Sequence, residues 1–490
     1  MTLGRRIVDS TLWATSANAA ATCVILVRSI VLARLLPIDV FGIYAFAAAV
    51  VGLTAVAAKF GLNSALLHRA DETRDESRAA AVHFTLTASL SILWATALIT
   101  GASVFSEGDY LLALLVLTGT QIGTLLASTP RALLQRRVTH RPLAWLRIWS
   151  ALITTAIALS LALAGHGLWA LLMIDVTGAA LSMIVLYLWR PVWRPRLTWD
   201  AQVVRYFLNF GVRNLIGQLL EESLRRLDKL WVGVTMEQRA LGLYSRSDAY
   251  SRAPAGFLLR PFSSIAAGAF AELRGDRLQL SRTVMRIAAV LFRSSCLIAI
   301  VVSLVAPELI LLLIGEKWLP MVDSFRILLV AFAFDSVGKT FSQLLIAIGF
   351  PGSLVRIRLV QVAVLGAGIL VFGRFGLTAI AASVLASTLA GLLLTLQAAH
   401  ASVDFSVPRL LLPPLSAAVP AALTGLFVQR ILPGDISTWI AVVIPALACA
   451  LVFVVLLLIL EGRELNENFR LVLRHIRRSR PAASREDSFS

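Results

Sequence analysis

Residues 209–245 read NFGVRNLIGQLLEESLRRLDKLWVGVTMEQRALGLYS, and this stretch decides the fold. It has the length and flanks of a membrane span, yet charged residues crowd its middle. At about 100° per residue, the polar side chains fall within an arc of roughly 120° on a helix. A membrane helix should turn such a stripe toward a wet interior, because ionised groups facing lipid cost several kcal/mol each. The alternative is an amphipathic helix that lies on the membrane surface. The polar residues are Asn214, Gln218, Glu221, Glu222, Arg225, Asp228 and Lys229.

The rest of the chain is strongly apolar. Of its 490 residues, 58% are hydrophobic and only 15% are charged. Apolar runs of about 20 residues recur throughout, which is typical of an all-α polytopic membrane protein. The formal net charge of +17 raises the question of nucleic acid. The basic residues, however, lie mostly in short loops between apolar runs, and this placement argues against nucleic-acid binding.

We expect about fourteen transmembrane helices. The first eight are expected at about 11–36, 38–58, 80–104, 110–130, 143–164, 167–189, 207–234 and 241–270. The last six are expected at about 287–306, 322–349, 355–373, 376–400, 410–429 and 438–460.

The distribution of Lys and Arg predicts the orientation of these spans. With both termini in the cytoplasm, most loop arginines lie on the inner side. The outer loops then hold only Arg239, Lys317, Arg374 and Arg430. We therefore expect a multi-pass membrane protein with both termini on the cytoplasmic side.

An internal repeat is visible when the chain is shifted by 200 positions. Phe41-Gly42-Ile43-Tyr44-Ala45 then overlays Leu241-Gly242-Leu243-Tyr244-Ser245. The match predicts two six-helix bundles, residues 1–206 and 207–400, around a central cavity. Two additional spans follow at 401–460, and a basic cytoplasmic tail occupies 461–490. The same shift places Arg28 over Asp228, which suggests that these two charges face each other.

Charged residues within the expected spans concentrate in the first, seventh and eighth helices, and the basic ones are in excess. Because Arg binds phosphate in a bidentate way, the cavity suits a phosphate or diphosphate ligand. The candidate substrate-binding residues here are Arg28, Arg225, Lys229 and Arg252. The candidates for coupling to Na⁺ or H⁺, or for gating, are Asp228, Asp248, Glu221 and Glu222. The two glutamates are equally suited to local pairing with Arg225 and Arg226, four residues away.

The sequence offers no catalytic motif, so we expect no enzyme activity and no bound cofactor. Gly338-Lys339-Thr340 has the end of a phosphate-binding loop, but Ala333 replaces the leading glycine. The histidines and the three cysteines show no metal-binding spacing.

Several motifs together resemble those of the polysaccharide transporter (Wzx-like) flippases, which belong to the superfamily of multidrug and lipid II exporters. They are Leu32-Ala33-Arg34-Leu35-Leu36-Pro37, Phe60-Gly61-Leu62-Asn63-Ser64, Leu227-Asp228-Lys229 and Gly315-Glu316-Lys317-Trp318-Leu319-Pro320, besides the two repeat copies. The resemblance implies movement of undecaprenyl-diphosphate-linked oligosaccharide from the inner to the outer leaflet by alternating access. Arg28 and Arg34 resemble the cavity arginines of the first helix in lipid II flippases. For Arg34 the alternative is a helix-end residue that reaches the interface.

Fourteen spans resemble the exporters of acidic exopolysaccharides such as colanic acid or succinoglycan. The resemblance implies membrane lipids as surroundings and a polysaccharide polymerase and export machinery as partners. Two alternatives stay open: a cation-coupled multidrug exporter of the same fold, and a membrane scaffold for polysaccharide-synthesis enzymes.

Overall fold

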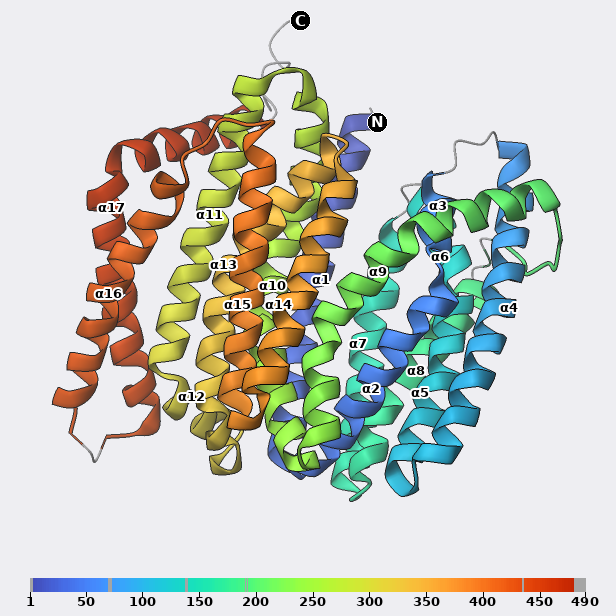
Figure 1. Cartoon of the computed structure of the whole chain (residues 1–490). Helices are drawn as coiled ribbons and strands as arrows, with labels where there is room; N and C mark the ends of the chain where they lie inside the picture. The colour runs from blue at the N-terminus through green and yellow to red at the C-terminus, as the bar shows by residue number, and fades with distance from the viewer. Residues whose placement is uncertain are drawn as a thin grey trace, which may run out of the picture.

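The computed structural model describes residues 3–68, 73–136, 140–189, 191, 193–433 and 436–479. Helices joined by short turns make up this part of the chain, which contains no strand (Figure 1). Eleven of the described helices are long and apolar enough to cross a membrane. The all-α class of a multi-pass membrane protein is therefore confirmed. The helices α9, α10 and α13 are of similar length but are not among the eleven, so the count of fourteen spans stays a prediction.

In the part of the chain that the structure describes, the first bundle contains eight helices and a π-helical extension. They are α1 (Leu3–Leu35), α2 (Ile38–Lys59), α3 (Leu62–His68), α4 (Thr73–Phe105), α5 (Gly108–Leu126), α6 (Ser128–Arg136), α7 (His140–Leu163), α8 (Gly167–Met183) and η1 (Ile184–Trp189). Within this bundle α1 packs along α7, while α2 packs against α4, α5 and α8.

The second bundle follows after an irregular segment. It consists of α9 (Ala201–Thr235), α10 (Gln238–Glu272), η2 (Leu273–Gly275), α11 (Arg277–Leu304), α12 (Ala306–Leu313), η3 (Glu316–Met321), α13 (Val322–Ala347), α14 (Pro351–Phe372), η4 (Gly373–Phe375) and α15 (Leu377–His400). The last two helices, α16 (Val407–Ile431) and α17 (Thr438–Ser479), pair with each other and pack on α11. The domain boundaries expected from the sequence stay a prediction.

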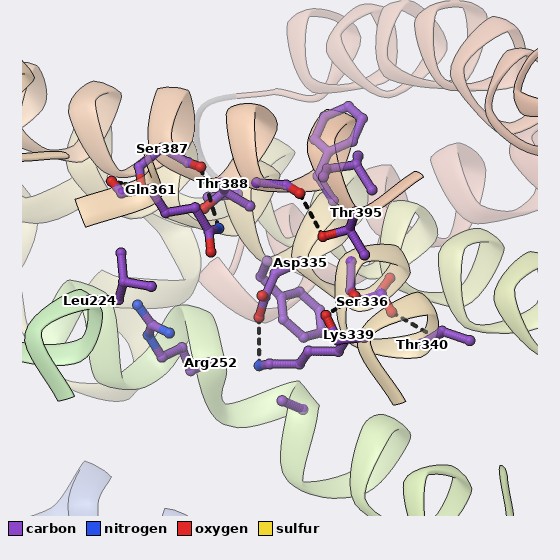
Figure 2. Close-up of a pocket in the computed structure, with 18 of the residues that line it drawn as sticks. Leu224, Arg252, Asp335, Ser336, Lys339, Thr340, Gln361, Ser387, Thr388 and Thr395 are labelled. Carbon is purple, nitrogen blue, oxygen red and sulfur yellow. Dashed lines mark hydrogen bonds and ion pairs between the residues drawn. The ribbon is translucent and has the colours of Figure 1, made fainter. Parts of the chain in front are cut away.

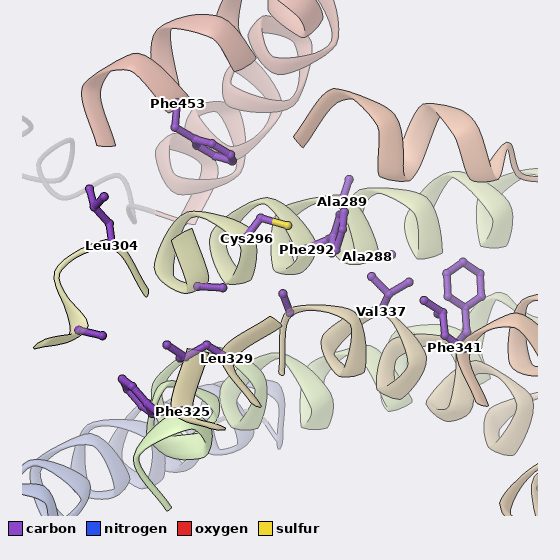
Figure 3. Packing of buried hydrophobic residues seen from close by; sticks show 14 of the residues in the cluster. Ala288, Ala289, Phe292, Cys296, Leu304, Phe325, Leu329, Val337, Phe341 and Phe453 are labelled. Atoms are coloured by element: carbon purple, nitrogen blue, oxygen red, sulfur yellow. The ribbon is translucent and has the colours of Figure 1, made fainter. Parts of the chain in front are cut away.

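Small and aromatic side chains form the core of the second bundle (Figure 3). Ala288, Ala289 and Phe292 of α11 lie in one buried cluster with Val337 and Phe341 of α13. Small alanines let the two helix backbones approach closely, as is common between helices inside membranes. The result is a firm support behind α13, one wall of the site described below.

Each expected span coincides with a long helix, but several ends differ. For example, α11 begins at Arg277, ten residues before the expected start at 287, because the Asp276 carboxylate caps it by accepting from the Gln279 backbone amide at 2.9 Å. At the other end of the chain, α17 continues past 460 after a break in helical geometry at Glu461. The first part of the expected tail is thus helical, and residues 480–490 lie outside the described residues.

The stretch at 209–245 forms most of α9 and the start of α10. The Asp200 carboxylate caps α9 by accepting from the backbone amides of Gln202 and Val203. Along its length α9 packs against α2 on one side and α14 on the other. This position between two helices favours the interior helix over the surface helix that was its alternative.

The helices α2 and α10 cross at two glycines that are 200 residues apart. A Cβ atom at Gly42 would lie 2.0 Å from the Gln238 carbonyl oxygen, and one at Gly242 would lie 2.3 Å from the Ile38 carbonyl oxygen. Residues 38 and 238 also differ by 200, so each helix places its glycine on the same backbone group of the other. This reciprocal contact is what a twofold relation between the bundles would produce, and it supports the predicted repeat.

The crossing gives a first prediction. Gly42→Ala should lower the melting temperature of the purified protein, because overpacking against a backbone carbonyl typically costs about 1–3 kcal/mol. Thermal unfolding in detergent measures the shift, with Gly366→Ala as the control, since a Cβ there has no neighbour within 4 Å. An unchanged melting temperature for Gly42→Ala would show that the crossing relaxes at no cost.

Candidate functional site

The second bundle contains a cavity of about 610 Å³ (Figure 2). Its lining comes from the facing sides of α9, α10, α11, α13, α14 and α15. The helices α13 and α14 follow each other in the chain, yet both pack chiefly on α15. The cavity volume lies within the range of about 300–1,000 Å³ that is usual for ligand sites.

Charged residues line one side of this cavity, and basic ones are in the majority. The four basic residues are Arg225, Arg252, Lys339 and Arg358, and the three acidic ones are Glu221, Asp248 and Asp335. Of the residues proposed from the sequence, the structure therefore brings Arg225, Arg252, Asp248 and Glu221 together at one site.

The carboxylate of Asp248 is the centre of one group of charges. Its Oδ2 atom lies 2.6 Å from the Lys229 Nζ atom, and its Oδ1 atom lies 2.5 Å from the Arg252 Nε atom. The side chain of Asp248 is 7% exposed, whereas that of Arg252 is 43% exposed. Asp248 thus binds the Nε atom of Arg252, and the other nitrogen atoms of this exposed guanidinium can donate to a ligand in the cavity.

Ion pairs of Glu221 and of Asp335 complete the charged side. The carboxylate of Glu221 accepts from Arg225 of the same helix at 2.8 Å and pairs with Arg358 of α14 at 3.1 Å. On α13 the Asp335 carboxylate lies 2.5 Å from the Lys339 ammonium (Figure 2). The local pairing of Glu221 that the sequence allowed is confirmed.

Asp228 and Glu222 face away from the cavity. Asp228 is 1% exposed and accepts from the Tyr244 hydroxyl and from the Lys229 backbone amide, both at 2.8 Å. Glu222 pairs with Arg226 at 2.9 Å, as its four-residue spacing suggested. The Arg226 guanidinium also donates to the Ala48 carbonyl oxygen of α2 at 2.6 Å, so this pair links the two bundles.

The candidate arginines of the first helix lie elsewhere. Arg28 donates to the Thr154 hydroxyl at 2.7 Å, near the Asp175 carboxylate that accepts from Tyr44. Since Arg28 bonds within the first bundle and Asp228 within the second, the expected pair between them is not formed in this structure. Arg34 is exposed in the last turn of α1.

The end of α1 meets the short helix η3 of the second bundle. The Lys317 ammonium donates to the carbonyl oxygens of Leu36 at 2.7 Å and Arg34 at 3.1 Å, and the Trp318 indole donates to that of Ala33 at 2.9 Å. Trp318 is fully buried. Burial lowers the pKa of the Lys317 ammonium. We call these three hydrogen bonds the closed-end contact. They satisfy the last carbonyls of α1 and join the two bundles.

Sequence reasoning missed part of the cavity. Asp335 and Lys339 were recognised only as charges within a span, although their spacing of four in an apolar helix indicates an ion pair. Arg358 falls within the expected span at 355–373 but was not among the candidate site residues, and it lies on α14. The glutamines Gln343 and Gln361 were not recognised as cavity residues, because only charged residues were considered as candidates.

Comparisons with known proteins were made on the sequence and on the fold. The pattern of the family described as polysaccharide biosynthesis protein matches residues 31–323. No curated protein matches the sequence.

Three solved structures are similar in fold. The lipid II flippase MurJ in an inward closed conformation has a TM-score of 0.75 and 11% identity, and the alignment covers 94% of this chain and 100% of that one. An inward-facing multidrug resistance MATE family transporter of the MOP superfamily has a TM-score of 0.60, 14% identity and coverages of 80% and 98%. A MOP superfamily transporter from Pyrococcus furiosus, described as having a reverse polarity of the binding pocket, has a TM-score of 0.54 and 13% identity. The alignment covers 82% of this chain and 96% of that one.

Proposed function

Since this chain belongs to the polysaccharide biosynthesis protein family, we propose that it is a flippase for lipid-linked oligosaccharides. Its substrate would be an undecaprenyl-diphosphate-linked repeat unit, moved across the bacterial inner membrane for exopolysaccharide or lipopolysaccharide synthesis. The likeness in fold to a lipid II flippase supports this assignment. A polymerase and the export machinery would take up the product, and both termini would remain in the cytoplasm.

The observation that carries the proposal is the excess of basic residues in a cavity of suitable size. Arg225, Arg252, Lys339 and Arg358 can offer guanidinium and ammonium donors to a diphosphate, which is the ligand that such groups bind best. The lipid tail would remain in the bilayer. Arg28 and Arg34 would contribute from the first bundle in another state of the cycle.

Alternating access fits the contacts between the bundles. Besides the packing of α9 against α2, where Arg226 donates to Ala48, they meet at the crossing of α2 and α10 and at the closed-end contact. Separation of these contacts would open the cavity toward the side predicted to be outer, as bundles rock about a central site in other transporters.

Two other functions are less well supported. A multidrug exporter for cationic drugs would need a cavity rich in free carboxylates, but Glu221, Asp248 and Asp335 are each paired with a basic residue. A scaffold for polysaccharide-synthesis enzymes would need no charged cavity inside its bundle.

Depletion of the protein in cells tests the proposed function. We expect the lipid-linked oligosaccharide to accumulate in the inner leaflet and the external polymer to be lost. The measurement is labelling of leaflet-exposed sugar in cells with and without the protein. A normal distribution between leaflets, together with intact polymer, would contradict the proposal and leave drug export as the next activity to test.

Asp228 is the best candidate for coupling to Na⁺ or H⁺, because its carboxylate accepts from a hydroxyl and a backbone amide. Asp248 and Glu221 each hold two basic residues instead. We expect Asp228→Asn to abolish the stimulation of flipping by an imposed ion gradient while substrate binding is kept. Flipping by vesicles with and without each gradient measures this, and undiminished stimulation would exclude Asp228 from coupling.

A further inference from the structure

The cavity has a second side that is neutral. Away from Arg252 and the pair of Asp335 and Lys339, α14 and α15 present the amide of Gln361 and the hydroxyls of Ser387, Thr388 and Thr395, with Arg358 about one turn from Gln361 on α14. Figure 2 shows Gln361, Ser387 and Thr388 gathered on one side of the cavity, while Arg252 and the pair of Asp335 and Lys339 lie on the other. A diphosphate needs only the charged side, so the neutral side has no role in the function proposed so far.

Close packing holds the neutral side in place. Gly391 of α15 makes room for Gln361, because a Cβ atom there would lie 1.8 Å from the Gln361 Nε2 atom. The Ser387 hydroxyl donates to the backbone carbonyl oxygen of Gln361 at 2.8 Å, which joins α15 to α14 beside this side chain. The side-chain nitrogen of Gln361, Nε2, makes only a long hydrogen bond of 3.4 Å to the backbone carbonyl oxygen of Ser387. The side chain is therefore positioned, but its hydrogen-bonding capacity is largely unused.

A second amide enters the cavity from α13. Gln343 is half-buried and lines the cavity, and it makes no hydrogen bond within the described part of the chain. Its side chain offers two donors and an acceptor. This amide is half-buried and is free to bond a polar ligand that enters the cavity.

We propose that Gln343, Gln361 and the α15 hydroxyls form a subsite for a sugar ring of the substrate. The inference rests on the proposed function. It assigns the sugar part of the substrate to the neutral side of the cavity. Sugar hydroxyls both donate and accept, as do amides and hydroxyls, and they carry no charge. Phe332 and Phe334 also line the cavity and supply apolar surface for the faces of the ring. A site that hydrogen-bonds a substrate hydroxyl discriminates against ligands that lack it.

Two probes separate the sugar from the diphosphate: farnesyl diphosphate and a farnesyl-diphosphate-linked hexose. We expect the purified full-length protein to bind the hexose form about tenfold more tightly, as a few net hydrogen bonds would give. Gln343→Ala and Gln361→Ala should bring the ratio of the two dissociation constants close to one while leaving that of farnesyl diphosphate unchanged. Isothermal titration calorimetry measures both dissociation constants for the wild type and for each variant.

Gln429→Ala is the matched control, since this half-buried glutamine also donates to a backbone carbonyl, that of Leu304, but lies outside the cavity. It should keep the wild-type ratio. A wild-type ratio of one, with farnesyl diphosphate still bound, would overturn the sugar subsite and leave the proposed function standing. Failure to bind either probe would overturn both.

Discussion

Replacing Arg252 with glutamine is expected to weaken binding of farnesyl diphosphate by about 10- to 150-fold. A hydrogen bond to a charged group contributes about 1.5–3 kcal/mol, and the Arg252 side chain lines the cavity and is 43% exposed. Its partner Asp248 keeps the Lys229 ammonium at 2.6 Å, so the variant leaves no buried carboxylate without a partner. Polymer export in cells should fall with the affinity.

Arg277→Gln is the matched control for this variant. Arg277 pairs with Asp404 at 2.7 Å, but both side chains are exposed and lie outside the cavity. Its affinity for farnesyl diphosphate should equal that of the wild type. Arg252→Lys keeps the charge without the planar fork, so its affinity should be intermediate. Equal affinities for Arg252→Gln and Arg277→Gln would remove Arg252 from the binding site.

The second large effect is expected from Trp318→Ala. The indole is fully buried, donates to the Ala33 carbonyl oxygen at 2.9 Å and packs edge-on against Phe41, with 5.5 Å between ring centroids. Truncating a buried tryptophan costs about 3–5 kcal/mol. If the closed-end contact exists only in the closed state, this loss shifts the balance toward the open state by about 10²- to 4 × 10³-fold.

Spin labels at Asp39→Cys and Arg239→Cys measure that shift, in a background without the native cysteines. Both positions are exposed, and they start α2 and α10 beside the crossing. Trp318→Ala should move the distance distribution to longer values. Trp439→Ala, at an exposed tryptophan of α17, should leave it unchanged. Identical distributions for the two variants would mean that the closed-end contact does not set the balance between states.

Long apolar runs made the helices predictable, and the matching motifs at 41–45 and 241–245 suggested an internal repeat but not the crossing of the two helices. Each expected span coincides with one helix because a membrane leaves a segment of that length and polarity few alternatives. The overlay of Gly42 and Gly242 predicted equivalent positions in the two repeats. In the structure each glycine lies against a backbone carbonyl oxygen of the other helix. The ends of helices were less predictable, since caps such as Asp276 lie outside the apolar runs.

The site was predictable only in part. The spacing of polar residues along α9 shows which of them share a face of the helix, but not which residues of other helices pack against that face. Glu221 and Arg225 line the cavity, whereas Asp228, on the same stripe, is buried against Tyr244 of α10. That outcome depends on how α10 packs, which spacing within α9 does not reveal. Likewise, Gln361 reaches the cavity because Gly391 on a different helix leaves room for it.

The central claim is that the protein moves a diphosphate-linked oligosaccharide between leaflets, and reconstitution tests it most directly. Vesicles containing purified protein and undecaprenyl-diphosphate-linked oligosaccharide are treated from outside with a reagent that modifies only accessible sugar. The account predicts that the lumenal pool becomes accessible with the wild-type protein, slowly with Arg252→Gln, and not in vesicles without protein. A lumenal pool that stays protected with correctly folded wild-type protein, under every imposed ion gradient, would contradict it.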